Sequence, residues 1–325
     1  MNKILKIVIT IILVSIIISQ MGGIGQVGLL LAGISPFYVF IVLLVYTLDR
    51  ALMVFKWGRL LKSRGIHLPF FQGMKIYCAS MVWGVFLPST VGADAIRAYC
   101  TSRFGLDSHE VVSSIILERL IGFLSALLLG FLSFVLFSHI GNPVTQFKHI
   151  WWAGGVSLFV AVAAFAASFS QRAFHFFHDR LFGGFRDTRI MQRLHKFHST
   201  YLSYKNDRKN LILFFGMTFG EQLMPILDSW LIARALGIHV GIAFIAGAVP
   251  LAMLISRLPV SIDGIGVFEG IFILLMAYAG VSASEAVAIS LAGRVLQTLS
   301  WMPWWLAYVG GIGGIRAPNP LKVKS

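Results

Sequence analysis

The chain has few of the residues on which soluble and metal-binding proteins depend. Only 12% of its 325 residues are charged, about half the share of a typical soluble domain. Its two cysteines, Cys78 and Cys100, provide neither a disulfide framework nor metal-ligand spacing. The sequence has no Walker loop, nucleophile elbow or zinc signature, and Gly264-x-Gly266 lacks the strand–helix unit of a dinucleotide fingerprint. These absences argue against a soluble enzyme with a common nucleotide or zinc site, and we expect no cofactor.

Apolar sequence takes the place of those features. Hydrophobic residues make up 57% of the chain and its mean hydropathy is +0.82, so lipid must solvate most of its surface. The net charge of +14 could suggest nucleic acid. However, the basic residues lie between apolar runs, where the positive-inside rule explains them. We therefore expect no nucleic-acid partner and predict an all-α polytopic membrane protein.

Apolar runs occur along the whole sequence, and a span needs about 20 such residues. We predict about eight transmembrane helices, at 4–21, 36–55, 111–138, 150–168, 211–236, 241–256, 267–279 and 285–311. No small-residue cleavage site follows the first run, so it reads as an uncleaved helix rather than a signal peptide. A further apolar arm, 70–87, precedes a stretch that is too polar to cross back. Residues 70–97 are therefore predicted to be re-entrant.

The distribution of charge predicts the orientation. Basic segments at 56–64, 97–103 and 171–210 and the basic tail fall on one side, whereas the loops of the other side have a single lysine, Lys148. This asymmetry predicts an inner-membrane protein with both termini in the cytoplasm.

We expect a single integral membrane domain over 1–325. It divides into a first half, 1–170, a basic cytoplasmic loop, 171–210, and a second half, 211–325, with a broken-helix segment at 257–269. The loop mixes basic residues with phenylalanines, which suits either an amphipathic helix on an anionic leaflet or an ordinary loop. The histidine pairs 175/178 and 195/198 are too few for a metal constellation, so we expect no metal.

Two segments interrupt the apolar pattern, at 88–97 and 259–269. Each follows an apolar arm, breaks it with a proline, and then presents a hydroxyl, a glycine and a carboxylate. Broken backbone at membrane depth survives only inside protein or against a water-filled cavity. Breaks in corresponding positions of two halves are typical of an inverted pseudo-repeat and mark a binding site.

Charged residues at membrane depth cost several kcal/mol, roughly 3 on insertion scales, and therefore indicate partners or function. The predicted substrate-binding residues combine the two breaks with the charges near them: Ser89, Asp94, Arg97, Glu118, Arg119, Glu221, Asp228, Arg257, Ser261, Asp263, Glu269 and Arg294. Asp49 and Arg50, near a predicted helix end, are interpreted instead as a packing pair.

Helical spacing narrows the roles of these residues. Asp94 and Arg97 are three apart and should meet if the segment after the break is helical. Glu118 and Arg119 are adjacent and need separate partners. The arginines, together with the positive ends of helices that begin at the breaks, suit a lipid phosphate.

Glu221 and Asp228 lie on one helical face, where Pro225 should kink the helix and free backbone carbonyls. The predicted carboxylates could orient the arginines, receive a substrate amine or hold a coupling proton.

Three motifs follow one another in a recognisable order. They are Pro88…Gly92-Ala93-Asp94-x-x-Arg97, Glu118-Arg119 and Pro250…Pro259-x-Ser261…Gly264-x-Gly266-x-x-Glu269. In these motifs the chain resembles the transmembrane (flippase) domain family of lysylphosphatidylglycerol synthases. The family often has Gly-Gly-Asp at 92–94 and an arginine where this chain has Phe268. The resemblance implies the lipid-translocating part of such proteins, without the soluble aminoacyl-transferase domain.

Three functions stay open at this stage. The first is a lipid translocator that moves an anionic or modified headgroup through a polar cavity. The second is a membrane-embedded transferase of lipid-linked sugar or phosphate in cell-envelope biosynthesis, with Asp94, Glu118 or Glu269 as general base. The third is a membrane partner that recruits a lipid-modifying synthase through the basic loop.

Overall fold

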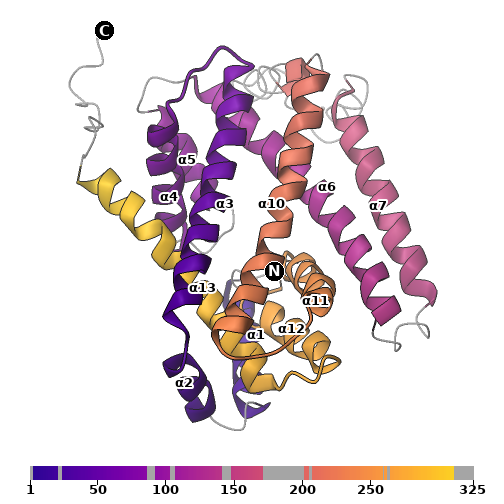
Figure 1. Ribbon diagram of the computed structural model, residues 1–325. Helices are drawn as coiled ribbons and strands as arrows, with labels where there is room; N and C mark the ends of the chain where they lie inside the picture. The colour runs from indigo at the N-terminus through magenta and orange to yellow at the C-terminus, as the bar shows by residue number, and fades with distance from the viewer. Residues whose placement is uncertain are drawn as a thin grey trace.

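The computed structural model describes residues 3–20, 24–85, 92–102, 107–140, 148–170, 201–204, 207–258, 260–261 and 264–310 (Figure 1). In these ranges the regular elements are helices: α1 (Lys3–Gln20), α2 (Ile24–Ala32), α3 (Pro36–Lys62), α4 (Phe70–Val85), α5 (Gly92–Ser102), α6 (Ser108–Ile140), α7 (Lys148–Ser168), α10 (Arg208–Ala235), α11 (Ile242–Ser256), α12 (Val267–Ala277) and α13 (Ala283–Val309). The predicted all-α fold is confirmed.

The surface of the described helices is that of a membrane protein. Helices α3, α6 and α10 are long and apolar enough to cross a bilayer, and shorter apolar helices accompany them. Large apolar side chains point outward, among them Ile212 and Phe159, which are 73% and 72% exposed. Such outward apolar surface needs lipid as its solvent. The chain is therefore an integral membrane protein.

The helices form two structural repeats of four. The first repeat is α3–α6, with 27, 16, 11 and 33 residues. The second is α10–α13, with 28, 15, 11 and 27 residues. Contacts between the repeats are reciprocal: α3 packs on α10, α4 on α13, and α6 on α11. An approximate twofold relation between the repeats produces this exchange of partners.

The two repeats run in opposite directions. The Ser35 N–H before α3 donates to the Ala235 carbonyl at the end of α10, at 2.8 Å. At the other end of α3, Arg59 donates to Asn210 in the first turn of α10, at 3.4 Å. Helices α3 and α10 are thus antiparallel (Figure 1). The repeat is inverted, an arrangement common in membrane transporters.

Close packing between the repeats uses glycine. A Cβ on Gly130 of α6 would lie 2.7 Å from Leu254 of α11, and one on Gly247 of α11 would lie 2.8 Å from Phe137 of α6. Small residues at such crossings allow two helices in lipid to approach closely. A side chain at either glycine would force the facing Leu254 or Phe137 side chain to move.

Three boundaries differ from the sequence-based prediction. Helix α3 continues to Lys62, so the residues from 56 onward are helical rather than a basic loop. Helix α2 occupies a segment expected to be an outer loop. Segments 241–256 and 267–279 were predicted to be two spans, but α11 and α12 have 15 and 11 residues and pack on each other. Helices of that length are too short for each to cross a bilayer alone. Together α11 and α12 form a packed pair, which occupies the place in the second repeat that α4 and α5 occupy in the first.

Candidate functional site

The first break brings the end of α4 against the start of α5. A Cβ on Gly84 would lie 2.7 Å from the Ala93 Cβ, so Gly84 leaves the space that the Ala93 methyl group fills. This contact accommodates the methyl group of Ala93, at the position where the resemblance in the sequence motifs would favour glycine. Residues 86–91 lie outside the described ranges, and the predicted site residue Ser89 is among them. Helix α5 then begins with Asp94 in its first turn, where a carboxylate suits the positive helix end.

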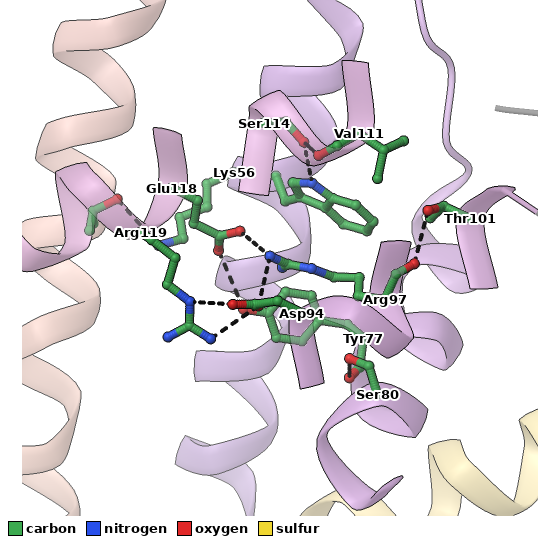
Figure 2. Close-up of polar contacts among 12 residues, drawn as sticks. Lys56, Tyr77, Ser80, Asp94, Arg97, Thr101, Val111, Ser114, Glu118 and Arg119 are labelled. Carbon is green, nitrogen blue, oxygen red and sulfur yellow. Dashed lines mark hydrogen bonds and ion pairs between the residues drawn. The ribbon is translucent and has the colours of Figure 1, made fainter. Parts of the chain in front are cut away.

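Arg97 is the centre of a buried ionic network at this break (Figure 2). Its Nη2 lies 2.8 Å from Glu118 Oε2 on α6 and 3.4 Å from Asp94 Oδ1 one turn earlier on α5. The guanidinium lies 4.8 Å from the Trp57 ring centre and 4.7 Å from that of Tyr77. The two ring faces offset part of the cost of burying the cation.

The neighbouring side chains complete the network. The Tyr77 hydroxyl donates to Glu118 at 3.3 Å, and the Trp57 indole N–H donates to Ser114 at 3.1 Å. Arg119 points away from Glu118 and donates to Asp94 from both Nε and Nη2, at 2.7 and 3.0 Å. Asp94 therefore accepts from Arg97 and Arg119 together. The expected Asp94–Arg97 contact and the separate partners of Glu118 and Arg119 are confirmed. We call these four residues the α5–α6 network.

The second break depends on two glycines with positive φ. Gly264 has φ 72° and Gly266 has φ 81°, values that other L-residues rarely adopt. A Cβ on Gly266 would also lie 2.7 Å from Leu13 of α1. Asp263, a predicted site residue, falls outside the described ranges. Ser261 is described, and its buried hydroxyl has no hydrogen-bond partner among the described residues.

Glu269 joins the second break to α13. One carboxylate oxygen accepts from the Gly266 N–H at 2.7 Å and caps α12. The other accepts from Arg294 Nε and lies 2.8 Å from Arg294 Nη2. The Arg294 side chain remains 39% exposed. A guanidinium and a helix N-terminus thus meet at one place, and the Glu269 carboxylate is the anion that binds both of them.

The two breaks have matching ion pairs. In each, a carboxylate in the first turn after the break meets an arginine 25 residues later in the chain: Asp94 with Arg119, and Glu269 with Arg294. Arg119 and Arg294 occupy the same position, counted from the first residues of α6 and α13. The inverted repeat therefore extends from the order of the helices to the ion pairs at the two breaks.

A cavity of about 390 Å³ lies between α3 and the second repeat. Its charged lining residues come from α3, from α10, from the end of α11 and from α13: Asp49, Arg50, Glu221, Asp228, Arg257 and Arg294. Tyr46, Gln222, Pro225, Ser229, Ser290 and Gln297 also line it. We call it the inter-repeat cavity. A larger hollow of about 500 Å³ at the far end of α3 has only Arg59 and Lys62 as charged lining residues, so the buried charges single out the inter-repeat cavity.

Ion pairing leaves two charges of the inter-repeat cavity without an ionic partner among the described residues. Glu221 pairs with Lys56, Asp49 with Arg50, and Arg294 with Glu269. Asp228 and Arg257 form no such pair in the described part of the chain.

Arg257 is exposed and makes only long hydrogen bonds, 3.4 Å each, to the Gly122 carbonyl and to Gln222. Its guanidinium therefore retains donors for a ligand.

The structure divides the predicted residues between two places. Glu221, Asp228, Arg257 and Arg294 line the inter-repeat cavity, with Glu269 behind Arg294. The α5–α6 network does not line it. The sequence-based prediction grouped the residues of both breaks as one set of substrate-binding residues, whereas among the described residues those of the first break do not line this cavity. A buried network with so many internal partners has few groups left for a ligand.

Sequence reasoning missed the contribution of α3. Asp49 and Arg50 were interpreted as a packing pair, yet both line the cavity. Lys56 was assigned to a cytoplasmic stretch, but it is 1% exposed, pairs with Glu221 and donates to Thr218. One signal could have found these residues: Asp49 and Lys56 have the same helical spacing as Glu221 and Asp228.

The described residues contain no cluster of three or more histidine, cysteine or acidic side chains that could hold a metal ion. The predicted histidine pairs of the basic loop lie outside the described ranges. The inter-repeat cavity presents guanidinium donors, carboxylate acceptors and hydroxyl groups in a site that apolar helices enclose.

Comparison with known proteins agrees with the resemblance in the sequence motifs. A family model described as lysylphosphatidylglycerol synthase TM region matches residues 3–304. Two UPF0104 membrane proteins of Methanothermobacter thermautotrophicus are 23% and 22% identical to this chain over 311 and 320 residues. Each match covers 90% of this chain and 89% or 90% of the relative. A UPF0104 membrane protein of Methanocaldococcus jannaschii is 20% identical over 301 residues, with 88% of both chains covered.

Proposed function

The chain belongs to the lysylphosphatidylglycerol synthase TM region family, and we propose that it is a lipid translocator that moves an anionic or modified headgroup through the inter-repeat cavity. The headgroup would pass along the polar lining while the acyl chains stay in the bilayer. The protein would act in the inner membrane with both termini in the cytoplasm. A lipid-modifying synthase would supply its substrate.

One observation supports this proposal above the others. The inter-repeat cavity combines Arg257, which has no ion-pair partner among described residues, with Arg294 beside the N-terminus of α12. The Arg257 guanidinium can donate two parallel hydrogen bonds to a phosphate from its planar fork. Arg294 already donates to Glu269, which also caps α12, and its side chain, 39% exposed, adds a second guanidinium to the same cavity. A volume of about 390 Å³ is large enough for a headgroup and too small for a whole lipid.

The inverted repeat gives a second argument. Transporters with this architecture bind substrate at the interface of the repeats and open alternately to the two sides. In this chain the cavity lies where α3 of the first repeat meets α10 and α13 of the second. A small rotation of one repeat against the other would change which side the cavity faces.

Reconstitution tests the proposal. Purified protein in liposomes should accelerate the transfer of labelled anionic phospholipid, aminoacylated phospholipid or polyprenyl-phosphate sugar between leaflets, relative to protein-free liposomes. Transfer of none of these lipids would contradict the proposal. Formation of a new lipid product from a donor substrate, without transfer, would favour the transferase.

A further inference from the structure

The inverted repeat makes residues of α3 and α10 equivalent. Counted from the first residues of the two helices, Asp49 corresponds to Glu221, and Lys56 corresponds to Asp228. The two members of each helix are two turns apart and so lie on one face. The first repeat thus has a carboxylate and an ammonium at these positions, whereas the second has two carboxylates.

This equivalence predicts two contacts between the helices, one on each side of the twofold relation. The first is the Lys56–Glu221 ion pair, which is buried. Asp49 lies two turns before Lys56 on α3, and Asp228 lies two turns after Glu221 on α10. Because the two helices are antiparallel, these two steps lead in the same direction and bring Asp49 towards Asp228. The second contact therefore sets one carboxyl group near another, with no lysine between them.

The structure bears out this juxtaposition. Asp49 and Asp228 both line the inter-repeat cavity and are 4% and 3% exposed. One oxygen of each, Oδ1, is buried without a hydrogen-bond partner among the described residues. Two buried carboxylates with unsatisfied oxygens are costly unless a cation lies between them.

Other oxygen atoms are close at hand. Pro225 lies inside α10 and has no N–H, so the Glu221 carbonyl loses its helical hydrogen bond. Glu221, Pro225 and Asp228 all line the cavity, and a helical side chain leans toward the preceding turn. Carboxylates together with freed backbone carbonyls are the usual groups that hold a coupling ion in broken-helix transporters.

The local charges decide the valence of the ion. The groups that face Asp228 are Tyr46, Asp49 and Arg50 of α3, Glu221 of its own helix, Arg257 at the end of α11 and Arg294 of α13. Arg50 neutralises Asp49, Lys56 neutralises Glu221, and Glu269 neutralises Arg294. Two charges are left over, the negative charge of Asp228 and the positive charge of Arg257. Once an anion occupies Arg257, a single positive charge balances Asp228.

We infer that Asp49 and Asp228 form a binding site for one monovalent cation, Na⁺ or a proton, in the place where the other repeat has the Lys56 ammonium. Binding of the cation does not depend on the proposed function. Only the step in which the cation influences the movement of the headgroup rests on it. With the cation at Asp228 and a phosphate at Arg257, the loaded cavity is electrically neutral. The electrochemical gradient of the ion would then bias the direction in which the headgroup moves.

Binding is measured without transport. The thermal unfolding midpoint of the purified protein in nanodiscs is recorded across NaCl concentrations, with N-methyl-D-glucamine chloride holding ionic strength constant, and separately across pH. If the ion is Na⁺, the midpoint rises with the Na⁺ concentration, since a ligand that binds only the folded state stabilises it. If the ion is a proton, the midpoint does not change with the Na⁺ concentration and falls as the pH rises.

Variants at the site separate this effect from general salt effects. Asp228→Asn should abolish the dependence that the wild type shows, and Asp228→Lys should abolish it by supplying an ammonium group, as Lys56 does. Asp107→Asn, at an exposed position before α6, is the matched control and should retain the dependence. If neither Asp228 variant folds, the binding of ²²Na⁺ and the uptake of protons by the wild type measure directly how many cations each protein molecule binds.

A wild-type midpoint that depends on neither ion, or an unchanged dependence in Asp228→Asn, would overturn the inference. So would the absence of both Na⁺ binding and proton uptake. A protein that binds the cation but moves no lipid would contradict the proposed function alone. Lipid transfer without any cation dependence would contradict only the inference.

Discussion

Replacement of Arg97 by alanine is expected to lower the free energy of unfolding by about 3–5 kcal/mol, the usual cost of leaving one partner of a buried ion pair without the other. Arg97 is 2% exposed and pairs with Glu118 at 2.8 Å. Its loss would leave the Glu118 charge buried and empty the space between the Trp57 and Tyr77 rings. Chemical or thermal unfolding in detergent measures the effect.

Two comparisons make this expectation specific. Arg119→Ala removes an arginine that also contacts Asp94, but its side chain is 54% exposed, so the loss should stay near the ~0–1 kcal/mol of an exposed pair. Adding Glu118→Gln to Arg97→Ala should restore part of the stability, because it removes the stranded charge. An Arg97→Ala protein as stable as Arg119→Ala would show that the α5–α6 network is not what holds this break together.

Substitution of Arg257 by glutamine should reduce the rate of headgroup transfer about ten- to a hundredfold, since a hydrogen bond to a charged group contributes about 1.5–3 kcal/mol. Arg257 lines the inter-repeat cavity, is exposed, and has only long hydrogen bonds to Gly122 and Gln222. With so few internal partners, its loss should leave the unfolding midpoint almost unchanged. The transfer rate in liposomes, at equal protein content, is the measurement.

Arg59→Gln is the matched control for this substitution. Arg59 lies on α3, outside the cavity, and forms a 3.4 Å hydrogen bond with Asn210. The same change of charge there should leave the transfer rate within about twofold of the wild type, because an exposed contact contributes little. Equal losses in both variants would mean that net positive charge, rather than the cavity arginine, supports transfer.

Local contacts were the most predictable part of the site. The meeting of Asp94 with Arg97 follows from their spacing on one helix, and the separate directions of Glu118 and Arg119 follow from their adjacency. The contact of Glu269 with Arg294 spans 25 residues and depends on how α12 and α13 pack. No local rule gives such a pair, although the matching break earlier in the chain suggests where to look.

The contribution of α3 was harder to foresee for a different reason. A lysine that follows an apolar run normally marks a membrane edge, and on that basis Lys56 belongs in a loop. In the structure α3 continues to Lys62, and α10 supplies Glu221 as the partner that allows the ammonium to be buried. Only the inverted repeat, which pairs these two helices, reveals that partner. The sequence pattern located the two breaks. Which of the described break residues line the inter-repeat cavity depends on how the helices pack.

Blocking the inter-repeat cavity with a thiol reagent tests the proposed path of the lipid headgroup most directly. Ser229 lines the cavity, and the two native cysteines, Cys78 and Cys100, are buried, so a Ser229→Cys protein presents one accessible thiol there. Modification with a bulky methanethiosulfonate should stop lipid transfer in Ser229→Cys. The same treatment should leave transfer unchanged in the wild type and in Ile212→Cys, whose side chain is 73% exposed on the outer face of α10. Undiminished transfer through fully modified Ser229→Cys would show that the headgroup does not pass through the cavity.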